Sequence, residues 1–460
     1  MILRSSPRSM WWVALDTTLM CASCVAAIYI RFGTQGSEVL VLRRGWIKVL
    51  LVTAIVQGAF YLFDLYDPDR IRGRAVLVLG IFQATGTASM GLAIIFYSAP
   101  QMMLGRGALL VSILLILVVM IYWRLSLLWL SQNPKFAERL LILGTDENSV
   151  TLAREVLSRR ECGYEVIGFL GDDPGLVGVS LINPRVLGVY DQLEDIVVRH
   201  RADRVVVATT DRRKRLPLVP LMSLKLCRKV AIEESASFYE RLTGKISTEM
   251  LRPSWLIFSQ VADPGRVYRR ITSILDVVCA VVILISTLPV MLVVAIAIKL
   301  DSDGPVFYSQ ERVGLHGRPF RIVKFRSMRA DAEKNGAMWA TQTDPRITSV
   351  GKLIRKCRID ELPQLVNVIR GEMSLIGPRP ERPVFVEELE RQIQYYGQRH
   401  LIKPGLTGWA QVRYRYGSSI EDAREKLRYD LYYIKNQSPW LDALILLETV
   451  RIVLFGRGAH

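Results

Sequence analysis

Two adjacent carboxylates, Asp360 and Glu361, lie in a part of the sequence that is rich in Arg and Lys. Pro363 follows them and opens a short segment whose apolar residues have helical spacing, which predicts a helix with proline in its first turn. The acid pair would lie at the positive N-terminal end of this helix, where carboxylates stay ionised and backbone N–H groups hold phosphate. Such a pair beside several guanidinium groups suits phosphoryl transfer with a divalent metal ion.

The charged residues around this pair divide into three chemical roles. Asp360 is the candidate nucleophile, because a carboxylate can attack phosphorus and form an acyl phosphate. Glu361 is the candidate ligand for Mg²⁺, which would bridge the oxygens of a diphosphate. Basic side chains bind phosphate oxygens, and a guanidinium does so with two parallel hydrogen bonds. The candidate phosphate-binding residues are Lys324, Arg355, Arg379 and Arg312.

The pattern by itself leaves a second interpretation open with equal weight. An Asp-Glu pair before a helix often only caps that helix, and scattered Arg residues often form a solvated face. The residue types and their spacing do not decide between a cap and a reaction centre.

A family resemblance decides between them. The segment RIDELPQLVNVIRGEMSLIGPRP, residues 358–380, resembles the signature of the bacterial sugar transferases, the polyprenyl-phosphate hexose-1-phosphate transferases. The resemblance extends upstream to GPVFYSQERVG (304–314) and KFRSM (324–328), and downstream to KPGLTGWAQ (403–411). It covers residues 268–460 with several ordered motifs. The sequence departs from the family at Arg358, where the family has Ser, and this adds a guanidinium beside the acid pair.

The resemblance implies a reaction and a setting. The donor would be a UDP-sugar, the acceptor undecaprenyl phosphate and the released product UMP, in the first membrane step of exopolysaccharide, capsule or O-antigen synthesis. The acid pair of the family aligns with Asp360-Glu361 and supports a covalent sugar-phosphate intermediate on Asp360. The expected location is the bacterial inner membrane with the catalytic domain on the cytoplasmic face, and downstream glycosyltransferases are the expected partners. The sugar, the polymer and a homo-oligomeric state are left open.

The composition agrees with a membrane protein that handles phosphates. Half of the residues are hydrophobic and the formal net charge is +17, which suits contact with anionic lipid. The basic residues are mixed with acidic ones and form no dense arm, so no nucleic-acid partner is expected. The six cysteines have neither disulfide nor zinc spacing.

The N-terminal part, residues 1–135, is expected to form a bundle of four transmembrane helices. Each apolar stretch approaches the ~20 residues that span a bilayer. Basic residues in the loops favour a cytoplasmic N-terminus, and four spans return the chain to the same side. The stretches are Trp11–Ile30, Trp46–Phe63, Ala75–Tyr97 and Ala108–Leu130.

Residues 136–245 alternate short apolar runs with helical patterns, which predicts a Rossmann-like module with a parallel sheet. The loop after the first strand, residues 144–149, lacks the glycine-rich phosphate pattern and carries two acids. We therefore favour a structural or regulatory role over nucleotide binding. Residues 246–267 are expected to be a linker.

Residues 268–460 are expected to form a mainly helical, monotopic catalytic domain with a re-entrant membrane helix over residues 271–300. Both flanks of this apolar segment are basic, and Pro289 would break the helix. Ser286 and Thr287 could satisfy the carbonyls that are freed there. The alternative is an ordinary fifth span, which would separate the module from the catalytic motifs. A last helix, with charged residues between its apolar ones, is expected to lie in the membrane interface.

The predicted fold class is thus a membrane protein that is part α and part α/β. Two other function classes remain. One is a membrane-anchored nucleotide-sensing or scaffold protein with a regulatory Rossmann-like module, which the intact acid pair disfavours. The other is a transporter, which is disfavoured because the spans are expected to lack intramembrane charges of the kind that mark substrate pathways.

Overall fold

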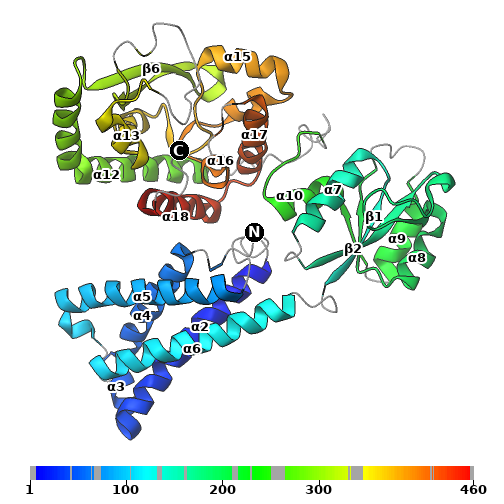
Figure 1. Cartoon of the computed structure of the whole chain (residues 1–460), viewed down its shortest axis with the longest axis horizontal. Coiled ribbons are helices and arrows are strands. Elements are labelled where there is room, and N and C mark those ends of the chain that lie inside the picture. The colour runs from blue at the N-terminus through cyan, green and yellow to red at the C-terminus, as the bar shows by residue number, and fades with distance from the viewer. Residues whose placement is uncertain are drawn as a thin grey trace. The chain divides into compact units, whose positions relative to one another are not determined.

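A computed structural model describes residues 7–41, 44–63, 65–66, 74–103, 105–131, 137–159, 163–209, 216–227, 230–249, 265–329, 332, 345–414, 417 and 419–455. The chain divides into two compact units, residues 1–243 and 244–460. Each unit is described by itself, with the element labels of Figure 1.

Four long helices contain the four apolar stretches that the sequence indicated. Their shared core includes Met20, Phe60, Ile81 and Met120, all fully buried. Each of the four helices is long and apolar enough to cross a membrane, and so is the segment Val267–Asp301 of the second unit. The helices are α2 (Pro7–Phe32), α4 (Gly45–Leu62), α5 (Arg74–Ser98) and α6 (Arg106–Ser131), with the short α3 (Gly36–Val41) between the first two.

A buried ion pair joins α2 to α6, and it corrects the expectation that these helices lack intramembrane charges. Arg124 donates to Asp16 Oδ2 at 2.5 Å and to the Leu65 carbonyl at 2.9 Å, and Trp123 donates to Asp16 Oδ1 at 3.1 Å. The two charged side chains are 8% and 1% exposed. Because each charge has its partner inside the helix cluster, the pair acts as a link between helices. The absence of charges can no longer be used against a transporter.

The second part of unit 1 is the predicted parallel sheet. Its strand order is β3-β2-β1-β4-β5, and every neighbouring pair is parallel. Figure 1 shows α7 and α10 on one side of this sheet and α8 and α9 on the other. The strands are β1 (Glu138–Leu143), β2 (Tyr164–Gly171), β3 (Val186–Val189), β4 (Arg204–Val207) and β5 (Ala231–Glu234). The helices are α7 (Glu147–Ser158), α8 (Leu193–Arg199), α9 (Leu218–Cys227) and α10 (Ser235–Thr243).

The acids of the loop after β1 fold back onto the module. Asp146 caps α7, because its carboxylate accepts hydrogen bonds from Ser149 N at 3.1 Å and from Ser149 Oγ at 2.6 Å. Gly144 has a φ of +132°, and a Cβ there would lie 2.4 Å from Ser149 Oγ. The first turn of α7 is thus filled by the chain itself. This is the arrangement expected of a Rossmann-like module that lacks the usual phosphate loop.

The first long helix of unit 2 is α12 (Gly265–Asp301), which is helical throughout and contains Pro289. The predicted break is therefore a bend in a continuous helix. Figure 1 shows α12 as two arms that meet at an angle, the second of which leads to β6. Ser286 Oγ and Thr287 Oγ1 donate to the carbonyls of Val282 and Ile283, both at 2.7 Å, and not to the carbonyl of Ile285, which Pro289 leaves without its helical donor. The expectation that these two hydroxyls satisfy the freed carbonyl is therefore wrong.

The rest of unit 2 is built from small sheets and short helices. An antiparallel hairpin, β6 with β7, and a parallel pair, β8 with β9, are surrounded by helices. The strands are β6 (Phe307–Val313), β7 (Pro319–Phe325), β8 (Ser374–Ile376) and β9 (Gly405–Thr407). The helices are α13 (Ser349–Lys356), α14 (Leu365–Ile369), α15 (Pro383–Gln392), α16 (Trp409–Arg413), α17 (Ile420–Lys435) and α18 (Pro439–Phe455), with 3₁₀ segments η8 (Ile359–Gln364) and η9 (Tyr396–Leu401).

Part of the predicted linker belongs to this unit. Ile246 is buried in a core cluster with Leu427 and Leu431 of α17, and its backbone N–H donates to the Arg428 carbonyl at 3.0 Å. Trp409 Nε1 donates to the Gly244 carbonyl at 2.8 Å. Residues 250–264, the remainder of the linker apart from its last three residues, lie outside the described part of the chain.

The last helix, α18, turns its charged residues into the protein. Asp442 accepts hydrogen bonds from Tyr268 of α12 at 2.5 Å and from Tyr433 of α17 at 2.9 Å. Glu448 and Arg451 form a buried pair at 2.9 Å. Leu447 and Val450 on the outer face are exposed, with several further apolar residues. Asp442 therefore joins this helix to α12 and α17, Glu448 and Arg451 pair within the helix, and an apolar face is left outside.

Candidate active site

The acid pair lies in the first turn of a 3₁₀ segment. Asp360 and Glu361 are the acidic residues at the start of η8, and Pro363 lies later in the same segment, which passes directly into α14. The predicted helix is thus a 3₁₀ turn followed by a short α-helix. Arg358 precedes the segment with a φ of +54°, in the left-handed region, and this turns the chain sharply between α13 and η8.

Glu361 is buried and is neutralised by three cations. Its Oε1 accepts a hydrogen bond from Arg379 Nη2 at 2.6 Å and lies 3.7 Å from Lys324 Nζ. Its Oε2 lies 4.0 Å from Arg358 Nη1. Burial alone would raise the pKa of Glu361, but Arg379, Lys324 and Arg358 outweigh this effect and hold the pKa well below its usual range. Glu361 is therefore a fixed anion at the centre of the cluster.

Asp360 differs from its neighbour. Its carboxylate accepts no hydrogen bond from any residue that the structure describes. Burial raises the pKa of Asp360 to about 6, and the charge of Glu361 acts in the same direction, while Lys324, Arg379 and Arg355 oppose them. A half-buried carboxylate with positive charges nearby and no donor bound to it is available to react with an electrophile.

Lys324 reaches the pair from β7, and a buried amide fixes that strand. Asn367 of α14 donates to the carbonyl of Arg321 at 2.7 Å and accepts a hydrogen bond from Val323 N at 3.3 Å. Burial lowers the pKa of Lys324 to about 8, with Glu361 opposing the shift. The ammonium is thus charged at neutral pH, and its charge is lost at mildly alkaline pH.

Arg379 is held at its backbone as well as at its side chain. Its carbonyl accepts a hydrogen bond from Arg399 Nη2 at 2.9 Å, and the same nitrogen lies 2.9 Å from Asp430 Oδ2. The side-chain amide of Gln411 is oriented so that its nitrogen donates to the Leu406 carbonyl at 3.2 Å and its oxygen accepts a hydrogen bond from Arg379 Nη1 at 3.3 Å. The hydroxyl of Tyr396 also accepts a hydrogen bond from Arg399 Nη1 at 2.5 Å. The sequence did not identify these supporting residues, which are Tyr396, Arg399 and Asp430.

The other two predicted phosphate-binding residues take different positions. Arg355 lies in the last turn of α13, from which its charge acts on Asp360. Arg312 of β6 donates to Gln310 Oε1 at 2.6 Å and to the Pro380 carbonyl at 3.2 Å. The cluster therefore unites Lys324, Arg355 and Arg379 around the acids, while Arg312 also supports the turn that carries Arg379.

Strands β8 and β9, which come from distant motifs, approach each other closely beside the turn that carries Arg379. Ser374 of β8 is aligned with Gly405 of β9, and a Cβ on Gly405 would lie 2.0 Å from Gly377 N. Only glycine allows this approach, which explains why both motifs contain it. Asp276 of α12 fixes the start of β8 by accepting hydrogen bonds from Ser374 Oγ at 2.7 Å and Leu375 N at 3.2 Å.

The acid pair has a composition that fits Mg²⁺ in the presence of substrate. Mg²⁺ is usually held by one or two carboxylates together with substrate phosphates rather than by a complete protein cage. In the described part of the chain, no group of three or more His, Cys, Asp or Glu residues could hold a metal ion. Two adjacent carboxylates, one of them without a hydrogen bond, fit the first kind of site.

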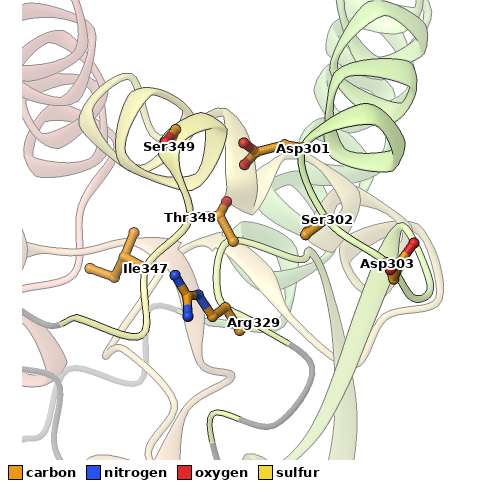
Figure 2. Close-up of a pocket in the computed structure, with 7 residues that line it drawn as sticks. All are labelled: Asp301, Ser302, Asp303, Arg329, Ile347, Thr348 and Ser349. Carbon is orange, nitrogen blue, oxygen red and sulfur yellow. The ribbon is translucent and has the colours of Figure 1, made fainter.

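A separate polar pocket of about 420 Å³ lies between the end of α12 and the start of α13. Figure 2 shows Asp301 and Ser302 on one side of it and Thr348 and Ser349 on the other, with the Arg329 side chain below. Its lining contains none of the residues of the acid-pair cluster. The pocket is thus not the space in which Asp360 would react.

Comparisons with known proteins match the part of the chain that contains the acid pair. A family model described as bacterial sugar transferase matches residues 267–456, and one described as CoA-binding domain matches residues 61–214. The chain is 47% identical over 221 residues to a UDP-N-acetylgalactosamine-undecaprenyl-phosphate N-acetylgalactosaminephosphotransferase of Aeromonas hydrophila, covering 48% of this chain and 52% of the relative.

Two UDP-glucose:undecaprenyl-phosphate glucose-1-phosphate transferases are also similar. The one from Klebsiella pneumoniae is 41% identical over 285 residues, 61% of this chain and 58% of the relative. The one from Caulobacter vibrioides is 42% identical over 189 residues, 41% of this chain and 71% of the relative. The chain thus spans about half the length of the Aeromonas and Klebsiella relatives.

Proposed function

The chain belongs to the bacterial sugar transferase family, and from this premise we propose that it transfers a hexose 1-phosphate from a UDP-sugar to undecaprenyl phosphate. UMP is the released product, and the reaction is the first membrane step of exopolysaccharide, capsule or O-antigen synthesis. The names of the three relatives support this proposal, because each names undecaprenyl phosphate as acceptor. The intact charged cluster favours the enzyme over a sensing scaffold.

Asp360 forms the covalent intermediate. A carboxylate oxygen of Asp360 attacks the phosphorus that bears the sugar, the bond between the two phosphates breaks, and UMP leaves with the electron pair. An oxygen of undecaprenyl phosphate then attacks the same phosphorus, and the Asp360 carboxylate is regenerated. The observation that carries this role is that the Asp360 carboxylate accepts no hydrogen bond from a described residue, whereas Glu361 beside it is fully paired.

The basic residues neutralise charge on the two phosphates. Lys324 and Arg379 already face the acid pair, and Arg355 supports it from α13. Arg312 would have to exchange its bonds to Gln310 and Pro380 for phosphate oxygens, so its phosphate-binding role stays a prediction. Glu361, with Asp360 beside it, would hold Mg²⁺ in exchange for part of its pairing with Arg379 and Lys324, and a bound Mg²⁺ would act as a Lewis acid on the diphosphate oxygens.

The catalytic unit is held in the inner leaflet by α12, which enters the cytoplasmic side of the membrane and returns to it. The bend of α12, in the upper left of Figure 1, and the basic residues Arg269, Arg270 and Lys299 at its flanks support this topology. The Tyr268–Asp442 hydrogen bond joins the first arm to α18, whose apolar face would lie in the interface.

A labelling experiment tests this topology. Single cysteines at Tyr268 and Asp301, in a cysteine-free background in intact cells, should both be shielded from a membrane-impermeant maleimide. Labelling of one position alone would mean that α12 crosses the membrane. Pro289→Ala should straighten the helix and lower activity more than expression.

A direct assay tests the activity itself. Purified protein, Mg²⁺ and undecaprenyl phosphate are mixed with a panel of nucleotide sugars, and UMP release is followed. We expect release with one UDP-hexose or UDP-N-acetylhexosamine and none without lipid acceptor beyond a single turnover. Absence of release with every sugar, from protein that folds and binds UDP, would favour the scaffold.

A further inference from the structure

Helix α9 of the sheet module is apolar on both of its faces. Leu221 and Leu224 are buried against the sheet, in the same cluster as Leu141 and Val205. The opposite face is exposed to solvent although it is equally apolar. Its side chains are Leu218, Val219, Met222 and Leu226, which are 61%, 79%, 62% and 76% exposed. A helix that is hydrophobic all round is normally buried or placed against lipid, so the outer face of α9 needs an occupant.

The sequence around α9 is strongly basic. Residues 212–229, RRKRLPLVPLMSLKLCRK, contain seven Lys and Arg residues and no acidic residue. An apolar helix face between cations matches the chemistry of an anionic bilayer surface, where the apolar side chains enter the headgroup boundary and the cations meet phosphate groups. A soluble protein partner would need an acidic rim of matching shape.

The chain also keeps this helix close to a bilayer. Helix α6, which is long and apolar enough to span, ends at Ser131, and β1 of the module begins at Glu138. The intervening residues reach at most roughly 20 Å. A tethered module meets the lipid surface at a high effective concentration, so even a short apolar face suffices for contact.

We propose that α9 is a membrane-surface anchor by which the sheet module lies on anionic lipid, on the side of the bilayer at which α6 ends. Leu218, Val219, Met222 and Leu226 insert at the headgroup boundary, and the exposed Lys225 contacts lipid phosphates. The inference goes beyond the transferase reaction, because it concerns a part of the chain without a catalytic residue. Figure 1 marks α9 on the sheet module, on the opposite face from α7.

Fluorescence quenching in nanodiscs tests the proposal with the full chain. Single cysteines replace Met222 or Leu226 in a cysteine-free background and carry a nitrobenzoxadiazole label. Leu157 on α7, which is 39% exposed on the opposite face of the sheet, is the matched control. With acyl-brominated phosphatidylcholine and phosphatidylglycerol, the labels at 222 and 226 should lose emission while the label at 157 does not. Quenching should weaken when phosphatidylglycerol is left out.

Two variants test whether the quenching depends on the apolar face of α9. Val219→Asp should abolish the quenching of the label at 222, and Leu157→Asp should leave it unchanged. Absence of quenching at 222 and 226 would overturn the proposal. So would labels that are shielded from water but not quenched by bromine, since a second copy or another protein would then cover the face. The readout is independent of turnover, so an inactive but quenched protein would refute the proposed function and leave the anchor intact.

Discussion

Asp146 of the sheet module and Asp360 of the catalytic unit both lie at the start of a helical segment, Asp146 as the N-cap of α7 and Asp360 in the first turn of η8, and their carboxylates have different surroundings. Asp146 accepts hydrogen bonds from the backbone and the side chain of Ser149, so its charge is used to stabilise α7. The carboxylate of Asp360 receives no hydrogen bond from a described residue, and burial raises its pKa to about 6. Asp146 is thus used as a cap because a backbone donor reaches it, whereas Asp360 has cations nearby without a bonded donor, and this difference underlies the proposal that Asp360 is the reactive acid.

The largest effect is expected from removing the charge of Asp360. Asp360→Asn should lower turnover by ~10³-fold or more, equivalent to about 4 kcal/mol of barrier, because the amide cannot form the acyl phosphate. Thermal stability should change little, since no hydrogen bond is lost. UMP release assays and a thermal melt measure the two. Near-normal turnover in the variant would contradict the nucleophilic role of Asp360, because Asp360 would then be no more reactive than Asp146.

A smaller loss is expected from Arg379→Lys. The ammonium keeps the charge but lacks the planar fork by which a guanidinium bonds Glu361 through one nitrogen and a phosphate through another, and a hydrogen bond to a charged group contributes ~1.5–3 kcal/mol. Turnover should fall by about 10- to 100-fold. Arg318→Lys, at an exposed position of the β6–β7 connection, is the matched control and should be silent. Equal rates for both variants would show that Arg379 only holds Glu361 in place.

The pH profile should report the shifted groups of the cluster. Asp360, with a pKa of about 6, must be ionised to attack, so kcat/KM should fall by about tenfold per unit below that pH. Lys324, with a pKa of about 8, must be protonated to hold phosphate, so kcat/KM should fall again above that pH. Lys324→Arg should remove the alkaline limb and leave the acidic limb. A profile that is flat from pH 5 to 9 would contradict both assignments.

The smallest effect is expected at the cap. Asp146→Ala removes the two bonds to Ser149 and should cost ~1 kcal/mol of module stability. Turnover in nanodiscs should stay within the error of the assay, because Asp146 has a structural role. Hydrogen exchange of α7 peptides would detect the loss. A large loss of turnover without a change in exchange would mean that this loop takes part in catalysis or its regulation.

The sequence predicted the local features of the fold well. The apolar stretches marked the four long helices of unit 1 to within a few residues, and the apolar run at Glu138–Leu143 marked the first strand of the sheet. These features follow from hydrophobic periodicity, which is a local property. The re-entrant topology of α12 remains a prediction, because it depends on a membrane as well as on Pro289.

The residues that the sequence did not reveal act through contacts between distant segments. Arg399 and Asp430 are 31 positions apart, and Asp16 and Arg124 are 108 apart. Neither pair has a spacing that indicates contact before the fold is known. Asp360 and Glu361 were identifiable as a pair, but their opposite pKa shifts depend on which cations come near each carboxylate.

The central claim is that Asp360 carries the sugar phosphate, and mass spectrometry tests it directly. The protein is incubated with Mg²⁺ and its UDP-sugar without undecaprenyl phosphate, quenched in acid and digested. The account predicts a sugar-phosphate adduct on the peptide that contains Asp360, which disappears when lipid acceptor is added and is absent from Asp360→Asn. Release of UMP in the full reaction with no adduct on this peptide, together with intersecting-line kinetics, would contradict it and favour direct transfer between the two substrates.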